Sequence, residues 1–251
     1  MYEFAGATAT FFKFLKQREL LGHFAQFGNL IKGLQYRVPH NAALSFLGPG
    51  QEVLDWSCGN GHFSLFLTMH QVNTTGFSFG QGCPAALRHN ELFHYVAGDT
   101  AEPVHIPFDD NKFDLVFSIG VLEHVHETGG DQAASLAEIH RILKPGGHFL
   151  CFHLPNKYSW VEAAARSVPR WPQYRHTKLF SKDDVEKLCA GANLRLMRWG
   201  RYNFLPRNSV DRLPLKLANS LFGAYLFECA DMALSTLLPW FKTQTYFIAC
   251  K

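Results

Sequence analysis

A glycine-rich turn between an apolar strand and an apolar helix is the first stretch with the composition of a ligand site. It lies in Glu52–Ser64 (EVLDWSCGNGHFS), which contains Asp55, Ser57, Gly59 and Gly61. The two glycines permit positive φ and have no Cβ, so backbone can approach a ligand while the N–H groups of the following helix start point at it. The turn predicts a nucleotide-sized binding edge, of a kind that dinucleotide-binding proteins also have.

The elements around this turn alternate between strand and helix. Apolar runs bounded by glycine, proline or aspartate predict strands near Glu52–Trp56, Val72–Phe79, Phe93–Ala97, Phe113–Ile119, His148–His153, Leu194–Gly200 and Thr245–Cys250. Helices are expected after the glycine turn to about His70 and over Pro84–Leu92, Asp131–Leu143 and Lys182–Ala190, with Lys144–Gly147 as a turn. This order predicts an α/β fold, a doubly wound and mostly parallel sheet of seven strands with helices on both faces.

Ligands of such sheets bind outside the carboxyl ends of the strands, near the point where the strand order reverses. The rule places Asp55–Gly61, Phe77–Phe79, Asp99–Thr100, Ile119–His124 and His153 along one rim. We therefore expect the chemistry of this chain at that rim.

Three further stretches stand in a fixed order with the glycine turn. They are TGFSFG (Thr75–Gly80), GDTAEPVHIPFDDNKFDLVFSIGVLEHV (Gly98–Val125) and LAEIHRILKPGG (Leu136–Gly147). Together with LDWSCGNG, this order resembles the class I S-adenosylmethionine-dependent methyltransferases, in particular the small-molecule enzymes similar to the ubiquinone and menaquinone methyltransferases. The resemblance covers about residues 51–152 and implies a Rossmann-like fold that binds S-adenosyl-L-methionine.

The resemblance also implies which residues contact the cofactor. They are Asp55, Ser57, Gly59, Gly61, Ser78, Phe79, Asp99, Thr100, Ile119 and Gly120. The group from Asp55 to Gly61 would hold the methionine part, with Asp55 favouring its ammonium. Asp99 would accept a hydrogen bond from the adenine amino group, and Ile119 and Gly120 would lie next to the sulfonium.

Two positions depart from the family pattern. Ser57 stands where the family usually has glycine, a change that serine tolerates if the backbone there keeps negative φ. Ser78 stands where the family commonly has a carboxylate that binds both ribose hydroxyls, so ribose binding would depend on neighbours such as Gln81. The missing acid and the absence of GxGxxG spacing also count against an NAD-dependent oxidoreductase.

Methyl transfer from a sulfonium requires an oriented acceptor atom and, for some acceptors, removal of its proton. An imidazole suits that second task. His124 at the rim is our first candidate and His153 at the end of the fifth strand the second, with Glu123 orienting either. Glu123, His124 and His126 also suggest a metal, but the ubiquinone O-methyltransferases that this stretch resembles have a second carboxylate where Gly120 stands, so we expect no metal.

The composition limits the kinds of partner that we expect for this chain. The formal charge is +3 without a Lys/Arg run, so nucleic acid is not expected. The six cysteines are dispersed and we see no secretory signal, so we expect a cytoplasmic protein. The 23 phenylalanines suggest an aromatic-lined cavity or an apolar surface.

The expected substrate is a small, apolar or aromatic metabolite that is methylated on O or N. The alternative from another functional class is a non-catalytic protein that binds the cofactor.

Two segments lie outside the alternating core. Residues 1–45 are expected to form an N-terminal helical cap, from which Tyr36, Arg37 or His40 could reach the site. Residues 46–251 are expected to form the methyltransferase domain. A helical insertion at about 203–242 precedes the last strand. Its apolar part, 213–240, is open to three interpretations: buried cap helices, a homodimer face, or a peripheral membrane contact that would present a lipid or quinone precursor.

Overall fold

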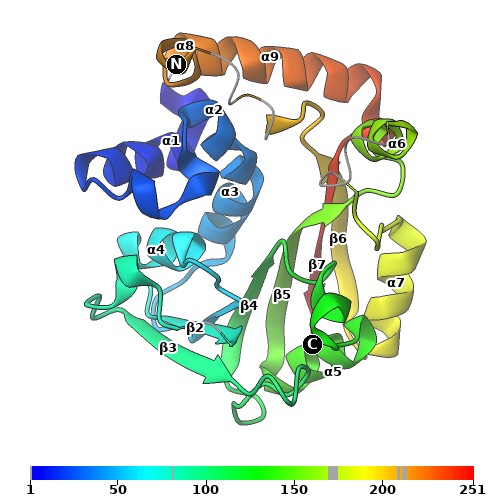
Figure 1. The fold of residues 1–251 in the computed structure, drawn as a ribbon. Helices are drawn as coiled ribbons and strands as arrows, with labels where there is room; N and C mark the ends of the chain where they lie inside the picture. The colour runs from blue at the N-terminus through cyan, green and yellow to red at the C-terminus, as the bar shows by residue number, and fades with distance from the viewer. Residues whose placement is uncertain (1, 81, 169–174, 208–209, 211–213) are drawn as a thin grey trace.

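The computed structural model describes all 251 residues except 1, 81, 169–174, 208–209 and 211–213. One seven-stranded sheet runs through the molecule in the order β3-β2-β1-β4-β5-β7-β6 (Figure 1). The strands are β1 Val53–Trp56, β2 Thr74–Phe79, β3 Phe93–Gly98, β4 Phe113–Ile119, β5 Leu143–Pro155, β6 Arg195–Tyr202 and β7 Gln244–Cys250. Neighbouring pairs are parallel except those of β7, which runs antiparallel to β5 and β6. The predicted fold class, a mostly parallel seven-stranded α/β sheet, is confirmed.

Helices cover both faces of the sheet, and each face has its own core. On one face α5 (Gln132–Ile142) and α7 (Lys182–Gly191) bury side chains such as Leu136 and Val185 against Val116 and Phe149. On the other, α4 (His62–Met69) packs with the N-terminal helices over Phe117 and Phe152. Strands buried on both faces read as nearly continuous apolar runs, which is why their bounds could be predicted.

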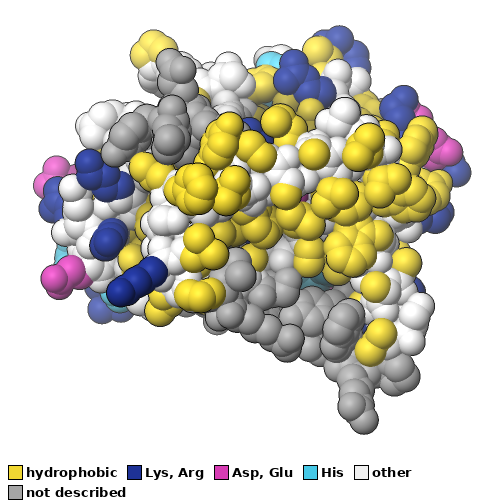
Figure 2. All heavy atoms as spheres, turned by 90° about the horizontal axis from the view of Figure 1, so that it is seen from above, with side chains coloured by type: hydrophobic (Ala, Val, Ile, Leu, Met, Phe, Trp, Pro, Cys, Tyr) yellow, Lys and Arg dark blue, Asp and Glu magenta, His cyan; other side chains and the backbone are white. Residues whose placement is uncertain are grey.

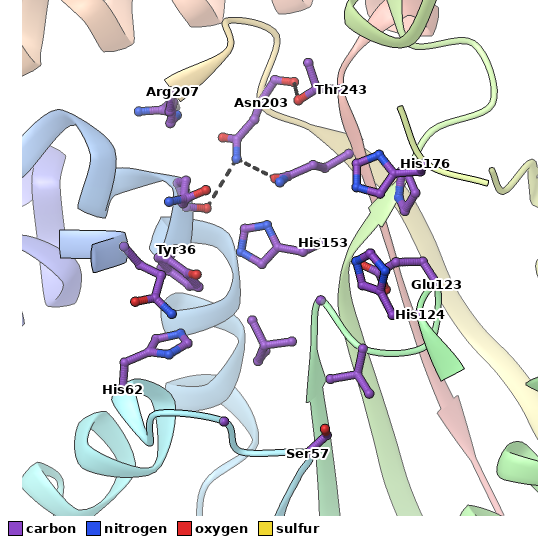
Figure 3. Close-up of a pocket in the computed structure, with 18 of the residues that line it drawn as sticks. Tyr36, Ser57, His62, Glu123, His124, His153, His176, Asn203, Arg207 and Thr243 are labelled. Atoms are coloured by element: carbon purple, nitrogen blue, oxygen red, sulfur yellow. Dashed lines mark hydrogen bonds and ion pairs between the residues drawn. The ribbon is translucent and has the colours of Figure 1, made fainter. Parts of the chain in front are cut away.

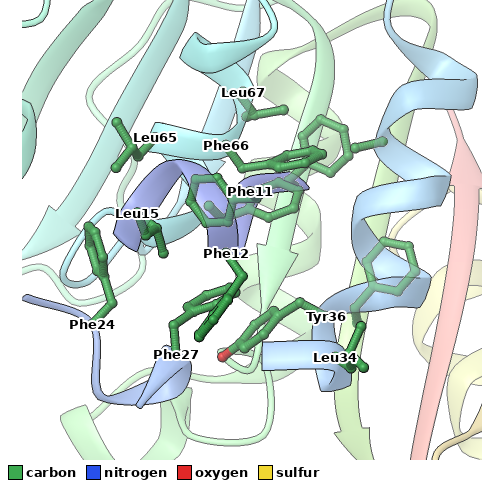
Figure 4. Close-up of a cluster of buried hydrophobic side chains, with 14 of the residues drawn as sticks. Phe11, Phe12, Leu15, Phe24, Phe27, Leu34, Tyr36, Leu65, Phe66 and Leu67 are labelled. Carbon is green, nitrogen blue, oxygen red and sulfur yellow. The ribbon is translucent and has the colours of Figure 1, made fainter. Parts of the chain in front are cut away.

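The N-terminal region consists of α1 (Tyr2–Gln17), α2 (Leu30–Gly33) and α3 (Arg37–Phe46), with single turns of 3₁₀ helix at Leu21–His23, Ala25–Phe27 and Leu34–Tyr36. Its aromatic side chains pack against α4: Phe11 meets Phe66 edge-on at 5.6 Å (Figure 4). The His40 ring stacks on Phe66 at 3.8 Å. The cap therefore shares the main core with the sheet. The division at residue 45 stays a prediction.

Two local predictions were wrong. The helix expected over Pro84–Leu92 is a single 3₁₀ turn, Ala85–Leu87, because Pro84 and Leu87 pack directly against Gly61 and hold the segment in place of a longer helix. The turn expected at Lys144–Gly147 is included in β5, whose pairing with β4 shifts register between Phe113 and Leu115.

The insertion before β7 forms α8 (Leu215–Ala218), α9 (Leu221–Leu237) and a 3₁₀ turn at Pro239–Phe241. In Figure 1, α9 runs above the carboxyl ends of the strands, from the N-terminal helices towards α6 (Trp160–Ser167). Asn219 accepts a hydrogen bond from the Leu30 N–H at 3.0 Å, which ties the insertion to α2. No helix in the described part of the chain is long and apolar enough to cross a membrane.

Candidate active site

A cavity of about 640 Å³ opens at the carboxyl ends of β1, β2, β4 and β5 (Figure 3). The volume is within the usual range for a small-molecule site. One part of its lining comes from the strand ends and includes Ser57, Gly59, Phe79, Ile119 and Gly120. The other part comes from the N-terminal helices, α6 and the segments around the insertion. The position agrees with the rim that the strand order predicts.

The glycine turn after β1 adopts left-handed backbone at three residues. Ser57 has φ +61°, Gly59 +53° and Gly61 +80°. The condition under which we expected serine to be tolerated, negative φ at Ser57, is therefore not met, and the serine holds a conformation that favours glycine.

The two glycines of the turn serve different purposes. A Cβ on Gly61 would lie 2.6 Å from Leu87 Cδ1, so Gly61 is required for packing. A Cβ on Gly59 would meet open space, with Ser57 O at 4.0 Å as its nearest contact, and Gly59 lines the cavity. Gly59 is thus a point at which bare backbone faces the cavity.

Asp55 lies beneath the turn and not in the cavity lining. The residue is 2% exposed, and its carboxylate accepts a hydrogen bond from the Ser64 hydroxyl at 2.6 Å. Burial raises the pKa of Asp55 to about 7. In this structure Asp55 connects β1 to the first turn of α4, and a direct contact with a cofactor ammonium stays a prediction.

The residues predicted for the ribose and adenine lie at the ends of β2 and β3. The Ser78 hydroxyl is 2.8 Å from the Tyr95 hydroxyl, and neither Ser78 nor Thr100 is among the residues that line the cavity. Asp99 is exposed and accepts a hydrogen bond from the Ala101 N–H at 2.8 Å. Phe79 alone of this group lines the cavity. The structure therefore places this group beside the cavity and Phe79 in it.

The end of β4 brings together Gly120 and two of the predicted catalytic residues. Gly120 has φ +71°, and a Cβ there would lie 3.7 Å from both Glu123 Oε1 and His153 Cβ. The space over Gly120 is the point where the lining from the strand ends meets the predicted proton acceptors.

His153 reaches that space because β5 is irregular there. Its pairing with β7 shifts register between Cys151 and Leu154, and His153 has φ +64°. The His153 N–H donates to the Tyr202 hydroxyl at 2.7 Å, which holds this strained backbone. The ring packs edge-on against Tyr36 at 4.8 Å, and Nε2 is buried without a hydrogen-bond partner in the described part of the chain. Burial lowers the pKa of His153 to about 4, so the imidazole is neutral at neutral pH.

His124, our first candidate, lies nearer to solvent. Its side chain is 46% exposed, and Nδ1 is 2.9 Å from Glu127 Oε1. Its Nε2 lies 3.8 Å from Glu123 Oε1. Glu123 is buried and its pKa is raised to about 7 by burial, while Oε2 has no partner among the described residues. Glu123 thus lies beside His124 and shares the space over Gly120 with His153, and its orienting role stays a prediction.

Several lining residues were not predicted from the sequence. They are Gln35, His62, Glu162, His176, Asn203, Arg207 and Gln244. His62 follows Gly61 directly, and its position in the first turn of α4 was the one signal that could have indicated it. The rest come from the cap, from α6 and the segment that follows it, from the insertion and from the first residue of β7, none of which has a recognisable motif. Of the cap residues expected to reach the site, Tyr36 does so, whereas Arg37 pairs with Glu228 at 3.2 Å and His40 is buried against Thr8.

The described residues contain no group of three His, Cys, Asp or Glu side chains arranged to hold a metal ion. Glu162 Oε1 is instead 2.5 Å from His176 Nδ1, and this hydrogen bond raises the pKa of His176. The phenylalanines expected around a cavity are mostly in the core, among them Phe63, Phe117 and Phe152. The acceptor side of the cavity is consequently more polar than the composition predicted.

The depressed pKa of His153 makes a prediction about stability. An unfolded histidine has a pKa near 6.5 and the folded one about 4, so lowering the pH from 7 to 5 protonates the unfolded chain preferentially and destabilises the fold. When the pH falls from 7 to 5, the unsubstituted protein should therefore lose about 2 kcal/mol of unfolding free energy that the His153→Asn variant does not lose. Urea denaturation at both pH values measures this. Between pH 7.5 and 8.5, where both forms are neutral, the difference should stay constant; a constant difference down to pH 5 would contradict the buried neutral imidazole.

Comparison with known proteins agrees with this geometry. Residues 30–198 match the family model described as a methyltransferase domain. An uncharacterized methyltransferase of Synechocystis sp. is 32% identical over 120 residues, which are 46% of this chain and 52% of that protein. The demethylmenaquinone methyltransferase of Corynebacterium kroppenstedtii is 37% identical over 100 residues, 39% of this chain and 40% of that protein. The chain thus spans about half or less of the length of the curated relatives it matches.

Solved structures show the same fold at low identity. A SAM-dependent methyltransferase from Archaeoglobus fulgidus superimposes with a TM-score of 0.57 and 16% identity, over 86% of this chain and 93% of that one. The family match covers more than half of the chain, which therefore belongs to the methyltransferase domain family. The family and fold predicted from the sequence are confirmed, and both comparisons support S-adenosylmethionine as the cofactor.

Proposed function

We propose that this protein transfers a methyl group from S-adenosyl-L-methionine to a hydroxyl oxygen of a small, uncharged metabolite. The observation that carries the proposal is that one cavity is lined by the open backbone of Gly59 and by the neutral His153, whose Nε2 has no hydrogen-bond partner among the described residues. One end of the cavity suits the cofactor and the other suits an acceptor.

The turn after β1 fits the amino-acid part of the cofactor. Gly61, the N-cap of α4, provides no side-chain cap, so the first-turn N–H groups other than that of Ser64, which bonds to Asp55, are available to a carboxylate. Ser57 and Gly59 would hold the methionine part, Phe79 and Asp99 would contact the adenine, and Ile119 and Gly120 would lie near the sulfonium. When bound there, the cofactor supplies an electrophilic methyl group.

His153 is the stronger candidate for proton removal. A neutral imidazole whose Nε2 has no hydrogen-bond partner among the described residues can accept a proton from a hydroxyl, and the lowered pKa of His153 keeps its imidazole in this neutral form at neutral pH. His124 is half-exposed and its Nδ1 is already engaged by Glu127. We assign the proton acceptor to His153 and a positioning role to Glu123.

The acceptor end favours an uncharged polar group. Gln35, Asn203 and Gln244 present amides, and Tyr36 a hydroxyl whose pKa is raised by burial. The positive charge of Arg207 is matched by Glu228 and Asp231, so this end has little net charge. A phenol or alcohol meets these conditions better than an anion or an amine that would become charged.

The test is transfer of tritiated methyl from S-adenosylmethionine to a panel of phenols, alcohols, amines and carboxylic acids, with products identified by mass spectrometry. The proposal predicts O-methylated products from phenols or alcohols. Exclusive transfer to amines or acids would contradict the acceptor class. Cofactor binding without transfer to any class would instead favour the non-catalytic alternative.

A further inference from the structure

Helix α9 has the reverse of the usual polarity of a surface helix. Its 17 residues contain two charged side chains, Glu228 and Asp231, and these are 2% and 5% exposed. Surface helices normally direct charged residues to water and apolar residues to the core. The outer surface of α9 therefore has no charged side chain of its own.

The inward charges anchor the helix to the rest of the protein. Glu228 pairs with the buried Arg207 and, at 3.2 Å, with Arg37. Asp231 accepts hydrogen bonds from the N–H groups of Phe204 at 2.9 Å and Leu205 at 2.7 Å. These contacts fix which side of α9 faces outwards.

The outer side is a continuous apolar surface (Figure 2). Ten of the thirteen exposed large hydrophobic side chains in the described chain belong to α8, α9 and the turn that follows. This outer apolar face consists of Leu215, Leu217, Phe222, Tyr225, Leu226, Met232, Leu237, Leu238, Trp240 and Phe241. Leu237 is 75% exposed and Trp240 61%. The buried-cap interpretation thus accounts only for the inner side of the insertion.

The solvent-facing charges of the segment that forms this face have one sign. Within 214–242 the solvent-facing charges are Lys216 at one end and the partly buried Lys242 at the other, since both acids point inwards. Arg201 lies over the Trp240 ring at 4.5 Å. Figure 2 shows Lys and Arg side chains at several places along the margin of the hydrophobic area, with a few Asp or Glu side chains at its outer edges. Apolar and aromatic side chains flanked by basic residues are typical of helices that lie in a membrane interface.

We propose that the outer apolar face docks on the surface of a lipid bilayer that contains anionic lipids, with α9 lying in the interface plane. A two-fold pairing of α9 with a second copy, parallel or antiparallel, would bring lysines together, whereas an anionic surface complements them. Arg207, which anchors α9, also lines the cavity, so the docked surface adjoins the acceptor end. The docking is independent of the proposed methyl transfer.

The experiment is co-sedimentation with vesicles of phosphatidylcholine, alone or mixed with phosphatidylglycerol, without cofactor. The variant Phe222→Ser/Leu226→Glu/Trp240→Ser removes three exposed residues of the face. The control Leu44→Glu/Met197→Glu changes two exposed apolar residues outside it. We expect the protein and its control to bind mixed vesicles more tightly than phosphatidylcholine alone, and the triple variant to bind about tenfold more weakly or worse. Thermal melts show whether each variant is folded.

The proposal would be overturned if the folded triple variant bound mixed vesicles as tightly as the unsubstituted protein, or if the unsubstituted protein did not bind them. Sedimentation velocity without lipid tests the second copy: a stable dimer that the triple variant dissociates would assign the face to self-association. A monomer in both cases, together with lipid binding, supports the membrane.

Discussion

Replacing Arg207 by leucine should lower the free energy of unfolding by about 3–5 kcal/mol. The Arg207 side chain is 2% exposed and lies between Glu228 and Asp231, which are also buried. Removing the cation leaves two buried carboxylates without their main counter-charge, away from water. The partly exposed Arg37 compensates only part of the negative charge of Glu228. Urea denaturation at neutral pH, followed by far-UV circular dichroism, measures the change.

A compensated variant separates the charge effect from lost packing. Arg207→Leu/Glu228→Leu/Asp231→Asn removes the buried cation and both buried carboxylates, and keeps an amide oxygen for the Phe204 and Leu205 N–H groups. It should regain most of the lost stability, because an apolar replacement of a buried ion cluster is often neutral. A single Arg207→Leu variant as stable as the unsubstituted protein would show that the two carboxylates are not buried as charged groups.

His153→Asn should lower the turnover number for methyl transfer about 10²-fold, the scale of a lost general base. Asparagine is chosen because it tolerates the positive φ at this position and keeps the N–H that donates to Tyr202. The imidazole Nε2 disappears while the backbone stays in place. Single-turnover rates with saturating cofactor measure the effect on the chemical step.

His124→Asn is the matched control for this prediction. It changes the same side chain type at a half-exposed position and should leave turnover within about threefold of the unsubstituted protein. Calorimetric titration of both variants with S-adenosylhomocysteine should give nearly unchanged affinity. If His124→Asn loses the activity and His153→Asn retains it, the roles of the two histidines are reversed.

The sheet could be predicted because its strands are apolar runs between strong boundary residues. Phe113–Ile119 has the predicted limits, since Lys112 and Gly120 bound a segment buried on both faces. The helix predicted after Pro84 failed because a local pattern does not show that Pro84 and Leu87 pack against Gly61 from a different part of the chain. Tertiary contacts decided that segment, and local propensity did not.

Residues that line the cavity could be predicted only where a sequence motif marks their position. The glycine turn and the ends of β2 and β4 were found, because glycine and strand termini mark them in the sequence. Our proposal of His153 over His124 has no basis in a sequence motif, because the irregularity in β5 that turns His153 towards Gly120 depends on pairing with β7 and on Tyr202. Arg207 and Asn203 reach the cavity from an insertion whose packing no periodicity indicates.

Calorimetric titration with S-adenosylhomocysteine tests the central claim, that the turn after β1 holds the cofactor through bare backbone at Gly59. Gly59→Ala adds a methyl group where the cavity is open, and Gly50→Ala is the matched control, because Gly50 also has positive φ and open space around its Cβ position but lies outside the cavity. We predict saturable one-to-one binding to the unsubstituted protein and to Gly50→Ala, and binding weakened about tenfold or more by Gly59→Ala. Absence of binding to the unsubstituted protein, or equal affinity in all three, would contradict the account.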